Sequence, residues 1–325
     1  MKAIVLPRYG PPDVLELREL PKPTPKDDEL LINIHASSVN SWDWEYLNGV
    51  PLINRLMFGL FKPGTGRKVL GADIAGTVEA VGRHVSRFRP GDEVFGDLWS
   101  NWGGFADYAC ARETSVELKP ANATFEEAAA VPQAGVLAVQ TIRKGGTMQP
   151  GQKVLINGAG GGVGTFAIQL AKLAGTDVTG VDAVHKLDVM RSIGADRVID
   201  YTQEDFTRTG ERYDLIIDCQ NFRSMFDNKR AMRPGGTYAM VGGSMLRVLE
   251  LMVLRFWSSI TRDSRKFCLL AKGPNKGLVD LKELIEAVKL VPVIDRVYRL
   301  SEVPDALRYF GEGRHRGKVV IATRS

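Results

Sequence analysis

Short apolar runs interrupted by turn residues fill the first part of this 325-residue chain. Leu30-Leu31-Ile32-Asn33-Ile34 and the alternating stretch 76–82 have the length and the β-branched content of strands. The proline-rich stretch 21–25 punctuates them. The pattern predicts an irregular β domain over residues 1–121.

From about Ala121 the pattern changes to apolar runs that alternate with helical segments. The strand candidates are 153–157, 177–182, 197–201, 214–219, 237–241 and 266–270. A helix is expected over 163–173, with Gly175 as its C-terminal cap. Because alternation of this kind is the signature of βαβ units, residues 122–272 are predicted to form a doubly wound parallel sheet.

The last 53 residues, 273–325, continue the pattern but are too few for a separate domain. A helix is expected over 278–290, a strand over 293–300, a second helix from Ser301 and a closing strand over 317–321. We expect this tail to return to the first domain. The predicted fold class is therefore α/β, with the parallel-sheet domain inserted into the β domain.

A glycine-rich loop separates the first strand of the second domain from its helix. It reads Asn-Gly-Ala-Gly-Gly-Gly-Val-Gly at 157–164. Gly158, Gly161, Gly162 and Gly164 allow a sharp turn and a close approach of a pyrophosphate, and the helix start at Val163 supplies free N–H groups. With a strand before it and a helix and second strand after it, this loop predicts dinucleotide binding.

Asp182 ends the second strand at the position where an acid commonly accepts hydrogen bonds from the ribose of NADH. Its carboxylate would repel the 2′-phosphate of NADPH. His185 and Lys186 follow closely and could offset that repulsion. The sequence therefore leaves NADPH and NADH both open.

Other nucleotide and nucleic-acid chemistries are not favoured. No tyrosine is followed by a lysine four positions later, as short-chain dehydrogenases require, and no GxxxxGK[ST] loop occurs. The net charge is +5, but the basic residues are scattered among 38 acidic ones rather than concentrated in a stripe. We expect no nucleic-acid partner.

Cysteine and histidine usage bears on metal and compartment. Cys110, Cys219 and Cys268 lie far apart, and the four histidines stand alone, so no zinc-binding spacing is present. Sparse thiols suit a reducing environment, and the chain opens on a strand-like run rather than a cleavable apolar segment. The expected location is the cytoplasm.

Several motifs, together with the glycine loop, resemble the medium-chain dehydrogenase/reductase superfamily across essentially the whole chain. They are the opening Met-Lys-Ala at 1–3, Gly-Ala-Asp-Ile-Ala-Gly-Thr-Val-Glu-Ala-Val-Gly at 71–82, Pro-Gly-Asp-Glu-Val at 90–94 and Ala-Ala-Ala-Val-Pro at 128–132. The run Gly-Gly-Val-Gly-Thr-Phe-Ala-Ile-Gln at 161–169 is most similar to the reticulon-interacting and chloroplast-envelope quinone oxidoreductase branch. The resemblance implies a GroES-like β domain joined to a Rossmann domain.

The zinc enzymes of this superfamily carry metal ligands at positions that here hold Asn40 and Ala72-Asp73. The resemblance therefore implies a reaction without zinc. Lacking a metal to polarise an alcohol or aldehyde, hydride transfer favours acceptors that are already electrophilic, namely quinones and α,β-unsaturated carbonyls. The alternative is a low-turnover NAD(P)H-binding protein that acts as a redox sensor or scaffold.

The resemblance also implies site residues and an assembly. Asn40, Asp43 and Tyr46 would line the pocket that faces the nicotinamide, with Asn40 as a donor to the acceptor carbonyl and Tyr46 as a donor or proton source. A homodimer through strand 266–270 is expected. Besides the glycine loop, the implied cofactor contacts are Asp182, Lys186, Tyr201, Val241, Gly242 and Gly243.

Two apolar segments, 52–61 and 245–257, follow the pocket motif and the Gly242-Gly243 pair. The second holds about 13 residues with three charges, too short and too polar to span a bilayer, and on a helix its charges fall in one arc. Our hypothesis is an apolar entrance for a large acceptor such as a lipid-derived enone or a prenylated quinone. Core or dimer packing and peripheral membrane contact are the alternatives.

Overall fold

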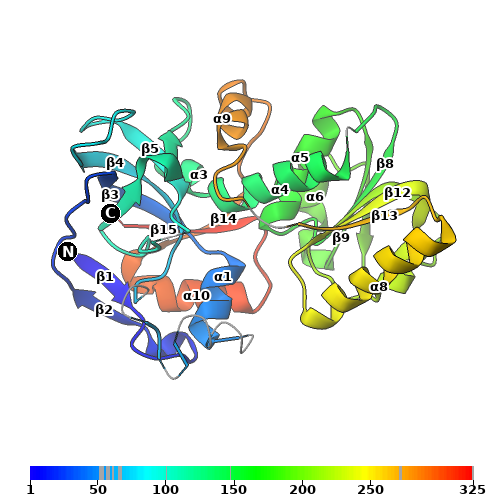
Figure 1. The fold of residues 1–325 in the computed structure, drawn as a ribbon, viewed down its shortest axis with the longest axis horizontal. Coiled ribbons are helices and arrows are strands. Elements are labelled where there is room, and N and C mark those ends of the chain that lie inside the picture. Colours follow the sequence, from blue (N-terminus) through cyan, green and yellow to red (C-terminus); the bar gives the residue numbers. More distant parts are fainter. Residues whose placement is uncertain are drawn as a thin grey trace. The chain divides into compact units, whose positions relative to one another are not determined.

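The computed structural model describes the chain at residues 1–50, 55, 59–60, 62–64, 68–99, 101–146, 148–270 and 273–323. It divides the chain into two compact units, unit 1 with Met1–Gln133 and Pro274–Ser325, and unit 2 with Ala134–Gly273 (Figure 1). Residues 122–133, which the sequence pattern assigned to the second domain, group with unit 1. The reason is that the helix at 125–129 packs on strands of unit 1, and the Gln133 N–H donates to the Asp73 carboxylate at 3.1 Å.

A seven-stranded mixed sheet forms the centre of unit 1 within its described residues. In spatial order its strands are β14 (Ile294–Arg299), β15 (Lys318–Ala322), β3 (Glu29–Ser38), β4 (Asp73–Val81), β5 (Glu93–Asp97) and β7 (Val116–Leu118), and β6 (Tyr108–Arg112) pairs with β3. Strand β15 pairs antiparallel with β3, Val320 opposite Ser38. The C-terminal segment thus completes the sheet that the N-terminal segment begins.

Short elements surround this sheet. The strands β1 (Lys2–Val5) and β2 (Glu16–Glu19) form a separate antiparallel pair. The helices of unit 1 in the described chain are α1 (Ser41–Asn48), α3 (Phe125–Ala129), α9 (Leu278–Glu286) and α10 (Val303–Gly311). Helix α9 ends before the predicted residue 290, since Val288 takes a left-handed conformation at φ 55°.

Unit 2 carries a six-stranded parallel sheet, as far as the chain is described. Its spatial order is β10 (Arg197–Asp200), β9 (Asp177–Asp182), β8 (Lys153–Asn157), β11 (Tyr213–Asp218), β12 (Met232–Val241) and β13 (Lys266–Leu270). The strand order reverses between β8 and β11. This is the doubly wound order, 3-2-1-4-5-6 along the chain, in which ligands bind where the carboxyl ends of the strands meet the reversal. The predicted Rossmann-type α/β fold is confirmed.

Helices cover the faces of this sheet (Figure 1). They are α4 (Pro132–Gly145), α5 (Gly162–Leu173), α6 (Leu187–Ser192), α7 (Met225–Arg230) and α8 (Met245–Thr261). Helix α5 packs on β8 and β9, and α8 packs on β13. The apolar segment 245–257 forms most of α8, whereas most of segment 52–61 lies outside the described residues.

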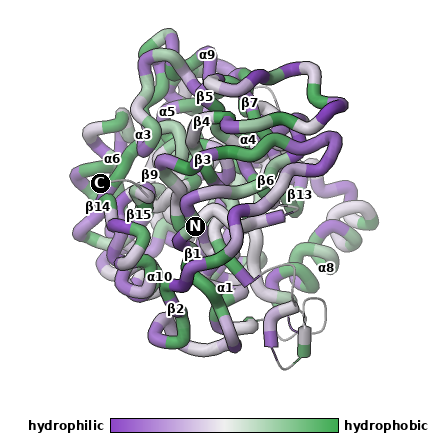
Figure 2. Tube along the Cα trace, turned by 90° about the vertical axis from the view of Figure 1, so that its left-hand side faces the viewer, coloured by the Kyte–Doolittle hydropathy of each residue, from purple (hydrophilic) through white to green (hydrophobic). Residues whose placement is uncertain are grey.

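The hydropathy of the chain is not evenly distributed on its surface. In Figure 2, hydrophobic residues recur along α8, although the helix lies at the margin of its sheet. No helix in the described ranges has a run of apolar residues long enough to cross a bilayer.

Candidate active site

The glycine loop lies at the carboxyl end of β8 and leads into α5. Gly158 has φ 83°, a conformation that favours glycine, and its N–H donates to the Val181 carbonyl at 2.9 Å. Gly161 is the extended residue before the first turn of α5. A side chain on Gly164 would overlap the backbone of Gly158 and Ala159, so only glycine lets the helix approach the loop this closely. The loop therefore has the conformation that the sequence predicted.

The same loop has room on its outer side. A Cβ added to Gly161 would meet no atom closer than the Gly158 carbonyl oxygen at 3.4 Å. Helix α5 begins at Gly162-Val163-Gly164, where the first backbone N–H groups have no partner within the helix. Free N–H groups at a helix N-terminus, reached over glycine, fit the pyrophosphate of a dinucleotide.

Asp182 and Lys186 meet beside this loop. The Asp182 carboxylate accepts the Gly160 N–H at 2.9 Å and lies 3.6 Å from the Lys186 ammonium. Both side chains are buried. Asp182 and Lys186, which the sequence predicted to have opposite effects on a 2′-phosphate, therefore form an ion pair. The carboxylate charge is thus partly compensated at the position where the adenosine ribose of a dinucleotide would lie.

The remaining predicted cofactor residues line the same edge of the sheet. Tyr201 directly follows β10 and is 48% exposed. Val241 ends β12, and Gly242 and Gly243 continue from it as exposed residues with positive φ. The structure thus brings the predicted cofactor residues to the carboxyl edge of one parallel sheet.

A buried aspartate that the sequence reasoning missed supports this edge at the reversal between β8 and β11. Asp218 accepts hydrogen bonds from the Asn157 side chain at 2.8 Å and from the Tyr238 hydroxyl at 2.7 Å. It also accepts the N–H of Asn221 at 2.8 Å. The signal in the sequence was a single acid at the end of an apolar run, and it indicates a side chain that ties neighbouring strand ends together.

In unit 1, Asn40 and Asp43 form the start of α1. The Asp43 carboxylate accepts the N–H of Asn40 and the N–H of Gly71, each at 2.9 Å. Burial raises the pKa of the Asp43 carboxyl to about 7, against the opposing effect of these two hydrogen bonds. The structure brings the two predicted residues together as a capping arrangement that also joins α1 to the segment before β4.

The Asn40 side chain belongs to a buried polar network with Asp73 and Lys318. Its amide nitrogen donates to the Asp73 carboxylate at 2.9 Å and to the Ser38 carbonyl at 3.3 Å. Its oxygen accepts from the Lys318 ammonium at 2.5 Å, and that ammonium lies 3.5 Å from Asp73. Sequence reasoning missed Lys318, whose signal was one lysine within the apolar closing strand.

This network does not fit a zinc ion. The oxygens of Asn40 and Asp73 already face the fixed positive charge of Lys318, which repels a divalent cation. Within the described residues, no three His, Cys, Asp or Glu side chains gather in a way that could hold a metal ion. A reaction without zinc remains a prediction.

Tyr46 is a core residue of unit 1. Its ring centroid lies 5.1 Å from that of Trp102 and 5.9 Å from that of Tyr9, and 2% of the residue is exposed. The Tyr46 side chain therefore packs in the core of unit 1 between these two rings. Its role as a donor or proton source stays a prediction, and its burial does not favour that role.

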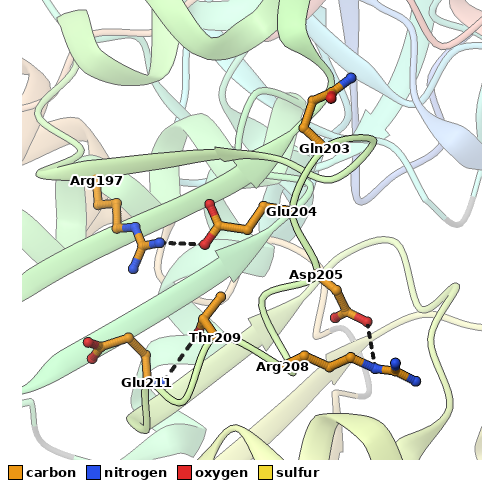
Figure 3. Close-up of a pocket in the computed structure, with 7 residues that line it drawn as sticks. All are labelled: Arg197, Gln203, Glu204, Asp205, Arg208, Thr209 and Glu211. Carbon is orange, nitrogen blue, oxygen red and sulfur yellow. Dashed lines mark hydrogen bonds and ion pairs between the residues drawn. The ribbon is translucent and has the colours of Figure 1, made fainter.

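An open pocket of about 440 Å³ lies elsewhere on unit 2 (Figure 3). Arg197 begins β10 and Glu211 precedes β11, so this pocket lies toward the amino ends of the strands. Its charges pair with one another, Arg197 with Glu204 and Arg208 with Asp205. Ligands of doubly wound sheets bind at the opposite edge, and we assign this pocket no role.

Comparisons with known proteins agree with this geometry. The family model "Alcohol dehydrogenase GroES-like domain" matches residues 26–141, and "Zinc-binding dehydrogenase" matches residues 193–321. The chain is 33% identical to a 2-methylene-furan-3-one reductase of Solanum lycopersicum, over 99% of this chain and 79% of that protein.

Two further matches cover both partners almost completely. A chloroplastic quinone-oxidoreductase homolog of Spinacia oleracea is 33% identical over 99% of this chain and 98% of its own length. The structure of the quinone oxidoreductase from Coxiella burnetii superposes with a TM-score of 0.89 at 30% identity, over 100% of this chain and 99% of that chain. The chain belongs to the medium-chain dehydrogenase/reductase superfamily, together with its quinone oxidoreductase-like members.

Proposed function

We propose that this chain transfers hydride from NADPH or NADH to quinones or α,β-unsaturated carbonyls without a zinc ion. The proposal rests on two features taken together. Unit 2 has a loop that fits a dinucleotide, and in unit 1 the Lys318 ammonium lies against Asn40 and Asp73, where its charge would repel a zinc ion. The names of the tomato, spinach and Coxiella relatives support the acceptor class.

In this proposal the predicted cofactor residues bind and orient the dinucleotide. Gly158, Gly161, Gly162, Val163 and Gly164 offer backbone N–H groups and a helix start to the pyrophosphate. Asp182 and Lys186 contact the adenosine ribose, and Tyr201, Val241, Gly242 and Gly243 contact the rest of the dinucleotide along the same edge. The bound nicotinamide supplies the hydride.

Asn40 is the unit 1 residue that we assign to the acceptor. Of its two amide N–H bonds, the one to the Ser38 carbonyl is the longer at 3.3 Å, and an acceptor oxygen can replace it. A donor at this point stabilises the negative charge that develops on a quinol or enolate oxygen. Asp43 acts as a positioning residue, since it holds the Asn40 backbone rather than facing outward.

The test is oxidation of NADPH and of NADH, followed at 340 nm, with protein freed of metal by chelation. The acceptors are a benzoquinone, a short enone, a long-chain enal and a simple saturated aldehyde. We expect turnover with the quinone or the unsaturated carbonyls and none with the saturated aldehyde. Turnover of the aldehyde that is restored by added zinc contradicts the proposal.

Two variants locate the role of Asn40. Asn40→Ala is expected to lower kcat by about a hundredfold to a thousandfold, the range for loss of a single oxyanion donor. Asn48→Ala, at the other end of α1, removes a bond to the Trp44 carbonyl and serves as the matched control with unchanged kcat. Equal kcat in both variants refutes the assignment of Asn40.

A low-turnover NAD(P)H sensor or scaffold is the second candidate function. The observation in its favour is that Asn40, Asp43 and Tyr46 are all buried and engaged with protein groups. The same assay separates the two, because a sensor binds NADPH or NADH with a measurable Kd and turns over none of the acceptors.

We further propose a homodimer and a cytoplasmic location. Strand β13 pairs only with β12 in the described chain, so its other backbone edge is available to the β13 strand of a second copy. The mass in sedimentation velocity tests the dimer, and a single monomeric species contradicts it. The three cysteines are free thiols, which supports a reducing compartment.

A further inference from the structure

Helix α8 turns its apolar side away from the protein. Eight large apolar side chains on it are exposed by more than half, Phe256 by 67% and Trp257 by 57%. At about 100° per residue they fall within an arc of about 140°. They form the α8 apolar face, defined as Met245, Leu246, Leu249, Met252, Val253, Phe256, Trp257 and Ile260.

The polar side of α8 faces inward and fixes this orientation. Arg247 pairs with Glu250 at 2.7 Å and donates to the Phe222 carbonyl, and Glu250 accepts the N–H of Met225 at 3.0 Å. Leu251 and Leu254 are buried in the core beneath the helix. The helix is thus anchored by an ion pair and two leucines. The α8 apolar face lies on the opposite side, where burial in unit 2 does not account for its hydrophobic residues.

The exposed face is large for a protein surface in water. Seventeen residues at about 1.5 Å each make a helix about 25 Å long, and the α8 apolar face follows it from Met245 to Ile260. Contiguous apolar surface of this extent marks a site of interaction. Core packing, one of the alternatives considered from the sequence, does not apply to these side chains.

The charges around the helix decide what covers it. The stretch 245–266 holds five basic residues and two acidic ones. Both acids are engaged, Glu250 with Arg247 and Asp263 with Lys229 and Arg265. Arg255, Arg262 and Lys266 have no acidic partner in the described chain. A second α8 seated on the α8 apolar face, rather than on the β13 edge proposed for the homodimer, would bring Arg255 and Arg262 close to the same cations.

We propose that α8 binds the surface of a bilayer that carries anionic lipids. The helix lies in the interface with the α8 apolar face toward the acyl chains, while Arg255, Arg262 and Lys266 extend to the headgroup phosphates. Trp257 lies at the level of the headgroups, the depth that tryptophan prefers. The inference rests on α8 and the residues that follow it as far as Lys266, and it does not depend on the proposed catalytic activity.

The experiment is co-sedimentation of the full chain with two kinds of vesicle, one of phosphatidylcholine alone and one in which about a third of the lipid is phosphatidylglycerol. We expect binding to the anionic vesicles that weakens at high salt, since the electrostatic part is screened. Phe256→Glu is expected to reduce the partition coefficient by about tenfold or more, because an exposed aromatic ring that would enter the acyl-chain region is replaced by an acid. Arg255→Gln with Lys266→Gln is expected to reduce it by several fold on anionic vesicles only.

Leu173→Glu is the matched control, since Leu173 is an exposed leucine on another helix of unit 2, α5. It should bind as the wild type does, and thermal unfolding checks that each variant is folded. Equal partition of Phe256→Glu and wild type overturns the proposal, as does equal binding to neutral and anionic vesicles. Absence of vesicle binding, with a dimer that Phe256→Glu dissociates, also overturns it and assigns the face to a second copy.

Discussion

Replacing Lys318 with methionine tests the buried network of unit 1. The ammonium of Lys318 lies 3.5 Å from Asp73, and the two side chains are 3% and 0% exposed. Removing one partner of a buried ion pair leaves the other charge uncompensated, at a cost of about 3–5 kcal/mol. Asp73 would still accept hydrogen bonds from Asn40, Ser38 and the Gln133 N–H, which places the expected loss near the lower end, about 3 kcal/mol.

The assay is urea unfolding of wild type, Lys318→Met, Asp73→Asn and the double variant. At about 2–4 °C per kcal/mol for a unit of this size, Lys318→Met should also lower Tm by about 6–12 °C. The double variant should lose less stability than the sum of the two single losses, by at least about 1 kcal/mol, because it removes both charges of the pair. Lys289→Met, at an exposed position of unit 1, should stay within about 0.5 kcal/mol of wild type.

Two results would refute this reasoning. One is a loss below about 1 kcal/mol for Lys318→Met, the range of an exposed ion pair. The other is strict additivity in the cycle, which would show that the ammonium and the Asp73 carboxylate do not interact.

Three other predictions concern the cofactor loop, the Asp43 carboxyl and cofactor selectivity. Gly164→Ala should raise the Kd for NAD(P)H by about tenfold or more in a fluorescence titration and destabilise unit 2 by about 1–3 kcal/mol. Gly161→Ala, at a position with room for a Cβ, should keep the Tm of the wild type. Equal stability of the two variants contradicts this prediction. The folded state holds the Asp43 proton up to its pKa of about 7, whereas the unfolded chain releases it near 3.8. The free energy of unfolding therefore falls by up to about 4 kcal/mol as the pH rises between those two values. Asp43→Asn should flatten this pH dependence in urea unfolding measured at several pH values, and an unchanged pH dependence contradicts the reasoning. Lys186→Ala should weaken NADPH relative to NADH by about tenfold, since it leaves the Asp182 charge uncompensated; an unchanged ratio of the two Kd values counts against that role.

Much of unit 2 follows from local pattern. Strands β8, β9 and β13 have the predicted bounds, because each is an apolar run between clear turn residues. The glycine loop is equally local, since Gly158 and Gly164 are required by backbone geometry within a few residues of each other. Where long-range pairing sets the ends, the bounds shifted, as in β12, which begins at Met232 rather than at residue 237.

The roles of the unit 1 residues depended on contacts between distant parts of the chain. Lys318 and Asn40 lie 278 positions apart, and no spacing in the sequence places that ammonium on that amide. Tyr46 had a plausible catalytic position next to Asn40 and Asp43, but packing against Tyr9 and Trp102 placed it in the core. A residue type and its neighbours specify what chemistry is available, while burial specifies whether a substrate can meet it.

Helix α8 separates the two kinds of information most clearly. Its periodicity already showed one polar arc and one apolar arc, because a helix places residues three and four apart on the same side. Which arc faces the solvent was decided by the inward ion pair of Arg247 with Glu250 and the Met225 N–H, a contact that exists only once α7 and α8 are packed together. Local pattern fixes an element and its sides, whereas the direction that each side faces follows from the partners that the folded chain brings to it.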